Sequence, residues 1–236
     1  MATPAWWPWF HGTVHYECRT LLASFFSLLL ALAQVMATPY KLTEDGFEEQ
    51  IAATHLGHFT LTAELIDRLK ASQPSRIVTQ SSMMHNFSGD LPLTAEGLNA
   101  KRWAWSIYAN AKLANMLFTL ELQKRLENKG LAPGIIAVAC HPGYTATNLQ
   151  NTPGYGPRWL SSGMNAMFAQ KVEVGAQPQL YAAVGADIQN GDYTGPLGNA
   201  SGPACKVPRA ERAKDQQAAA KLWALTAQLT KTDFLN

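Results

Sequence analysis

The spacing of apolar residues predicts two long helices and two buried strands in the central part of the chain. Over residues 47–69 apolar side chains recur every three or four positions, which is typical of an amphipathic helix, and Pro74 marks its end. A second long helix is predicted over residues 103–128. The segments 75–81 (SRIVTQS) and 135–140 (IIAVAC) are short and β-branched or continuously apolar, so they predict buried strands.

The elements that follow extend the same alternation of helix and strand. A helix is predicted around residues 172–184, a short strand near Tyr193, and a last amphipathic helix over 215–229. Residues 83–102 show no clear periodicity and predict a loop. Strand–helix–strand units at this spacing indicate an α/β fold, in which helices cover both faces of a parallel sheet.

The first 35 residues differ from the rest, so we divide the chain into an apolar N-terminal segment, 1–35, and a main unit, 36–236. The apolar run 21–35 has about the length of a signal peptide and contains the small-residue pattern of a cleavage site. It is shorter than the roughly 20 residues of a membrane span. Because Arg19 is the only lysine or arginine before it, we favour a buried helix or strand and a cytoplasmic location. Secretory entry and a membrane anchor through residues 21–35 remain the alternatives.

Composition narrows the range of partners. The chain has 236 residues, 15% of them charged, and a formal net charge of +2, which gives no electrostatic reason to expect nucleic acid as a partner. Its three cysteines show no CxxC or Cys/His ligand spacing, so no metal site is predicted.

Tyr108 and Lys112 form the pair of residues with the clearest chemistry. They stand four positions apart on the predicted helix, so the phenol and the ammonium lie on one face. A nearby cation should lower the pKa of the phenol from its usual value near 10 and allow proton exchange at neutral pH.

Two predicted strand ends supply further candidates, because ligands of parallel α/β sheets bind beyond the carboxyl ends of the strands. Ser82 follows the first strand, and its hydroxyl is suited to hold a carbonyl oxygen against Tyr108. Ser81 is the rival, although strand alternation should turn it to the opposite face. The Pro142-Gly143 turn follows the second strand and allows backbone to approach a ligand closely.

Several segments of the chain resemble the short-chain dehydrogenase/reductase superfamily, and most of all its retinol-dehydrogenase and WW-domain-oxidoreductase branch. The segments that carry the resemblance are MATPYKLTEDGFEEQ, THLGHF, RIVTQSS, YANAKLANMLFTLEL, HPGYTATNL, GDYTGP and AAKLWALTAQLT. They occur in the order and at the spacings of the family. The resemblance implies an NADP- or NAD-dependent oxidoreductase that interconverts a small-molecule alcohol and an aldehyde or ketone, here an apolar one.

The resemblance also implies a role for each matching residue. Ser82 would hold the substrate oxygen, Tyr108 would give or take its proton, and Lys112 would lower the pKa of Tyr108 and bind the nicotinamide ribose. Tyr108 and Lys112 thereby count among the cofactor-binding residues as well. The nicotinamide end of the cofactor would be lined by Pro142, Gly143, Thr145 and Thr147.

The sequence departs from the family in two places. Thr54 stands where the family has an asparagine that supports a proton-relay water. The family's Gly-rich Thr-Gly-x-x-x-Gly-x-Gly turn does not occur in the sequence, and Gln34 with the next two residues stands where its Asn-Ala-Gly-Val-Met turn ends. We therefore expect an incomplete Rossmann-like doubly wound parallel sheet that lacks the N-terminal Gly-rich βαβ half.

This departure leaves other interpretations open. Loss of the Gly-rich cradle favours a catalytically impaired family member that acts as a binding or regulatory protein, or a misassigned gene start. An exposed sheet edge with an apolar face would also favour self-association into a homo-oligomer.

Overall fold

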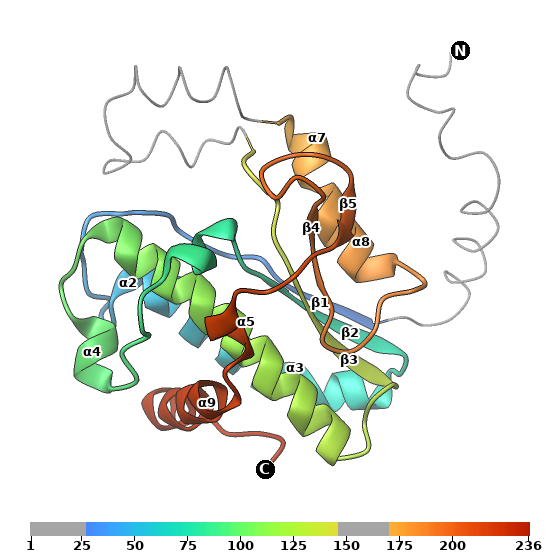
Figure 1. The fold of residues 1–236 in the computed structure, drawn as a ribbon. Coiled ribbons are helices and arrows are strands. Elements are labelled where there is room, and N and C mark those ends of the chain that lie inside the picture. Colours follow the sequence, from blue (N-terminus) through green and yellow to red (C-terminus); the bar gives the residue numbers. More distant parts are fainter. Residues whose placement is uncertain (1–26, 146–169) are drawn as a thin grey trace.

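The fold is described by a computed structural model over residues 27–145 and 170–236. Within these residues five strands form one sheet in the order β1-β2-β3-β4-β5 (Figure 1). The first four strands are mutually parallel, and β5 is antiparallel to β4. The strands are β1 (Ser27–Ala31), β2 (Ser75–Gln80), β3 (Ile135–Cys140), β4 (Tyr193–Pro196) and β5 (Ala204–Lys206). The predicted α/β fold with a largely parallel, Rossmann-like sheet is confirmed.

Helices cover both faces of this sheet (Figure 1). The longer ones are α3 (Gly57–Ala71), α5 (Ala104–Asn128), α8 (Gln177–Val184) and α9 (Gln216–Thr230). The shorter ones are α2 (Glu49–Ile51), the π-helix η2 (Ala52–Leu56), the 3₁₀ helices η3 (Met83–Phe87) and η5 (Glu211–Lys214), α4 (Ala95–Asn99) and α7 (Val172–Gly175).

Alternating side chains of the central strands explain why both faces are covered. Ile77 and Ile135 pack in a core cluster with residues of α3, α5 and α9. Val78 and Ile136, the next residue of each strand, pack in a separate cluster with residues of α8. Since successive side chains of a strand point to opposite faces, a strand that is apolar at every position needs a helix on each side.

Aromatic rings fix α9 against the rest of the domain. Trp223 of α9 stacks on Phe118 of α5 with ring centroids 5.7 Å apart, and it meets Phe59 of α3 edge to face at 4.9 Å. All three side chains are buried. Such pairs contribute beyond the apolar area that they bury, so this cluster holds the three helices of one face together.

The first strand lies inside the apolar run predicted near the N-terminus. β1 pairs in parallel with β2, and its Leu29 and Ala31 are buried while Leu28 and Leu30 are about 40% exposed. Residues 27–31 of the run therefore form a strand of the sheet, in agreement with the buried-strand alternative, and residues 32–35 are irregular. No helix in the described part of the chain is both long enough and apolar enough to cross a membrane.

Candidate active site

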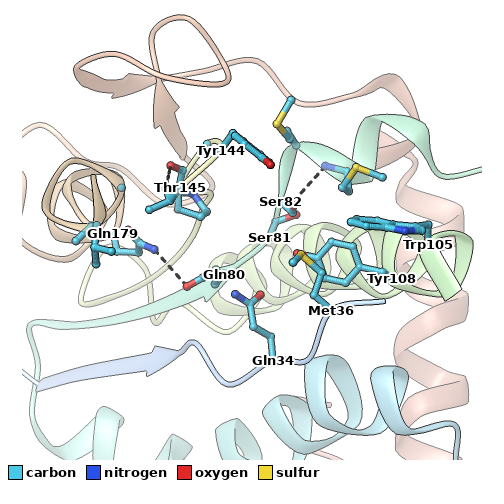
Figure 2. A pocket seen from close by; sticks show the side chains of 17 residues that line it. Gln34, Met36, Gln80, Ser81, Ser82, Trp105, Tyr108, Tyr144, Thr145 and Gln179 are labelled. Carbon is cyan, nitrogen blue, oxygen red and sulfur yellow. Dashed lines mark hydrogen bonds between the residues drawn. The ribbon is translucent and has the colours of Figure 1, made fainter. Parts of the chain in front are cut away.

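A pocket of about 490 Å³ opens beyond the carboxyl ends of β2 and β3 (Figure 2). This volume lies in the range of small-molecule sites, and the position is the one expected for a ligand of a parallel α/β sheet. The pocket is lined by Gln34, Met36, Gln80, Ser81, Ser82, Met83, Met84, Trp105, Tyr108, Pro142, Gly143, Tyr144, Thr145, Val172, Gly175, Ala176 and Gln179.

Ser82 reaches the pocket because the chain leaves β2 in an extended conformation and then turns into η3. Its Oγ accepts a hydrogen bond of 3.2 Å from the Met84 N–H, so Ser82 caps the short helix. Ser81 also lines the pocket, but its hydroxyl is engaged elsewhere, because Oγ donates to the Lys112 carbonyl at 3.0 Å. Ser82 is therefore the serine whose hydroxyl lies beside Tyr108 (Figure 2).

Tyr108 and Lys112 lie on the same face of α5, as their spacing predicts. The Lys112 Nζ lies 5.6 Å from the centroid of the Tyr108 ring. The ammonium is completely buried; Nζ donates to the Gln34 Oε1 and, at 3.2 Å, to the Gln80 carbonyl. Tyr108 lines the pocket, whereas Lys112 does not and lies behind the pocket wall.

Burial controls the protonation of this pair. It raises the pKa of Tyr108 to about 12, and the side-chain hydrogen bond with Ser82 opposes that rise only in part. Burial also lowers the pKa of Lys112 to about 7, against a smaller upward effect of the Cys140 thiol. The expectation that the ammonium lowers the pKa of the phenol is thus wrong for this structure. In the water-excluded interior the loss of hydration disfavours the charged form of each group, and it is the largest effect on both pKa values.

The Pro142-Gly143 turn closes another wall of the pocket. Gly143 has φ = 71°, its N–H donates to the His141 Nδ1 at 3.2 Å, and the Thr145 Oγ1 donates to the Pro142 carbonyl at 3.1 Å. All three predicted residues of this wall, Pro142, Gly143 and Thr145, line the pocket. Thr147, the fourth predicted residue, lies outside the described residues.

Gly143→Ala is expected to destabilise the fold by about 2–4 kcal/mol. The added methyl group would be strained by the left-handed backbone at this position and would also clash with its neighbours. A Cβ at this position would collide with the Ala200 carbonyl oxygen and lie 2.7 Å from the Pro196 Cγ. Gly130→Ala is the matched control, because Gly130 has φ = 65° and open space at its Cβ, so only the conformational cost of about 1 kcal/mol applies. Urea unfolding of both variants would measure the difference; equal losses would show that the turn is not closely packed.

Sequence patterns did not identify several lining residues. Gln34 and Met36 follow β1 and Tyr144 follows β3, so the rule that places ligands beyond strand ends could have found them. Gln179 comes from α8, and only the packing of that helix brings it to the pocket.

Thr54, the residue that replaces the family's asparagine, lies in the π-helix η2 and is completely buried. Its hydroxyl has no hydrogen-bond partner among the described residues. It does not line the pocket described above.

Comparison with known proteins places this arrangement in a family. The chain is 37% identical to human retinol dehydrogenase 13 over 211 residues and 34% identical to human retinol dehydrogenase 12 over 206 residues. Each match covers 86% of this chain and 60% of the relative. A solved structure of an uncharacterized protein from Mycobacterium paratuberculosis is 39% identical with a TM-score of 0.69, and the match covers 92% of this chain and 71% of that protein. No family model matches the chain.

The fold and these relatives define the class: the chain belongs to the short-chain dehydrogenase/reductase superfamily, in its retinol-dehydrogenase-like branch. It spans about 60% of the length of the curated relatives that it matches.

Proposed function

We propose that this protein is an NAD(P)-dependent oxidoreductase that interconverts an apolar alcohol and the corresponding aldehyde or ketone, with NADP as the favoured cofactor. One observation carries the proposal: the hydroxyls of Ser82 and Tyr108 meet in one pocket with the Lys112 amine behind the Tyr108 ring. This arrangement supplies a hydrogen-bond donor and a proton donor for a single carbonyl oxygen.

At neutral pH the Tyr108 phenol carries a proton, as a phenol with its ordinary pKa near 10 also does, and it can give this proton to the substrate oxygen. Burial raises the pKa of Tyr108 to about 12, which makes the phenol a weaker acid in the empty pocket. Ser82 would hold that oxygen while Tyr108 protonates it. A bound nicotinamide would supply the hydride to the carbonyl carbon.

The residues around the Pro142-Gly143 turn fit the nicotinamide end of such a cofactor. Gly143 and Thr145 both line this wall, and Thr145 brings a hydroxyl to it. Lys112 would bind the ribose. The remaining wall carries Met36, Met83, Met84 and Trp105, which suit an apolar substrate.

Titration with cofactor tests this proposal through thermal unfolding. A cofactor at about 100 times its Kd should stabilise the protein by roughly 2.7 kcal/mol and raise Tm by about 5–10 °C. Reduced nicotinamide mononucleotide should also raise Tm, because the described lining residues are assigned to the nicotinamide end, whereas adenosine 2′,5′-bisphosphate is the control. An unchanged Tm at millimolar NADPH and NADH would contradict the proposal.

A second candidate is a family member that binds ligands in this pocket without turnover. One observation favours it: the Gln34 side chain accepts a hydrogen bond from the Lys112 amine, which would otherwise bind the ribose. Binding of NADPH with no oxidation of it in the presence of apolar aldehydes would support this candidate over the first.

A further inference from the structure

Gln34 lies between the pocket and the buried amine of Lys112. It belongs to the irregular segment after β1, its side chain is half-buried, and it lines the pocket (Figure 2). Its Oε1 accepts a hydrogen bond from the Lys112 Nζ. Lys112 is completely buried and is absent from the pocket lining. A ligand in the pocket therefore meets the Gln34 carboxamide where it would otherwise meet the amine.

The other contacts of Lys112 hold the amine in place from behind. Nζ donates to the Gln80 carbonyl at 3.2 Å, and the Asn115 Nδ2 donates to the same carbonyl at 2.9 Å. The Lys112 carbonyl in turn accepts from the Ser81 hydroxyl. These contacts join α5 to the end of β2, so the amine is fixed by regular structure. Gln34, on an irregular segment with a flexible side chain, is the contact that can move.

We propose that Gln34 shields the Lys112 amine, and that a ligand whose hydroxyl groups bind this amine must first displace the Gln34 side chain. The inference deepens the proposed function and rests on it, since the nicotinamide ribose is the diol that would compete with Gln34. Small carbonyl compounds need only Ser82 and Tyr108, and they bind without displacing Gln34. Gln34 thus determines whether a ligand binds only to Ser82 and Tyr108 or also reaches the Lys112 amine.

Chemical modification of Lys112 tests the shield without any cofactor. Reductive methylation with formaldehyde and cyanoborohydride requires a neutral, accessible amine, and with a pKa of about 7 the Lys112 amine is largely neutral at pH 8. Accessibility therefore limits the reaction. Peptide mass spectrometry should show methylation at Lys112 about tenfold faster in Gln34→Ala than in the wild type, which corresponds to loss of one hydrogen bond worth about 1.4 kcal/mol.

Gln179→Ala is the matched control, because Gln179 is the same residue type in the same pocket and the Lys112 side chain donates to Gln34 and Gln80 instead. This variant should leave the methylation rate of Lys112 unchanged. Gln34→Asn, which keeps an amide on a shorter side chain, should give an intermediate rate and serves in place of Gln34→Ala if that variant does not fold. Equal rates in the wild type and the Gln34 variants would overturn the proposal.

Measuring the affinity for NADPH distinguishes an error in the role proposed for Gln34 from an error in the proposed function. NADPH should bind Gln34→Ala about tenfold more tightly than the wild type, since the ribose no longer competes with the carboxamide. Faster methylation with no NADPH binding in any variant would support the shield and refute the cofactor. Unchanged binding by Gln34→Ala would refute the role of Gln34 in ligand selection.

Discussion

Tyr108→Phe is expected to lower the turnover of an apolar aldehyde by about 10²–10⁴-fold, the usual contribution of a positioned proton donor. The substitution removes one hydroxyl from a ring that is 4% exposed and keeps the shape of the ring, so the pocket should persist. Affinity for NADPH should change little, because the ring itself remains against Lys112. Oxidation of NADPH followed by its absorbance, together with a binding titration, would measure both quantities.

Tyr193→Phe is the matched control for this prediction. Tyr193 is also 4% exposed, lies outside the pocket lining, and has a hydroxyl without a hydrogen-bond partner among the described residues. Loss of that hydroxyl should leave turnover unchanged and stability equal or slightly higher, since a buried unpaired group carries a desolvation cost. Turnover by Tyr108→Phe at the level of Tyr193→Phe would remove Tyr108 from the mechanism.

The sheet and its main helices could be predicted because their sequence signals are local and repeated. The helix predicted over 103–128 is observed at Ala104–Asn128, and the strand predicted at 135–140 is β3 with the same bounds. The strand ends then led directly to Ser82 and to the Pro142-Gly143 turn, both of which line the pocket. These predictions succeeded for one reason. The period and length of an apolar run determine whether it forms a helix or a strand, and the end of each predicted strand then shows which residues border a ligand site.

Other features depend on contacts between distant residues and had no local signal. Residues 83–102 were predicted as a loop, yet they contain η3 and α4, short helices held by the caps Ser82 and Thr94. The strand β5 has three residues and exists through its pairing with β4. The contact of Gln34 with Lys112 joins residues 78 positions apart.

The sign of the pKa shift of Tyr108 was the most consequential error. Sequence spacing gives the distance between the phenol and the amine, but the shift also depends on how much water each group loses. Both groups are buried, and desolvation is the larger effect. The consequence is a phenol whose pKa lies above its usual value near 10, where the spacing predicts one lowered toward neutral pH.

Mild acid is expected to destabilise this protein. Burial lowers the pKa of His55 to about 3 and the pKa values of His58 and His141 to about 4, below the usual 6.5. Between pH 6.5 and pH 4 these histidines are therefore protonated in the unfolded chain but neutral in the folded chain. Because the unfolded state binds more protons, the free energy of unfolding falls as the pH falls. At pH 5 each histidine should cost about 2 kcal/mol, together about 6 kcal/mol, against a total stability of about 5–15 kcal/mol for ordinary domains.

The histidine that best isolates this effect is His58, whose two ring nitrogens have no hydrogen-bond partner within the described chain. His58→Leu should change stability little at pH 7.5, because the ring interacts at most weakly with the Thr54 backbone, and should reduce the loss between pH 7.5 and pH 5 by about a third. Urea unfolding at constant ionic strength would give both free energies. Stability that stays constant from pH 7.5 to pH 5 in the wild type would mean that these rings are hydrated enough to ionise in the folded state. An unchanged pH dependence in His58→Leu would assign the acid sensitivity to the other buried histidines, His55, His85 and His141.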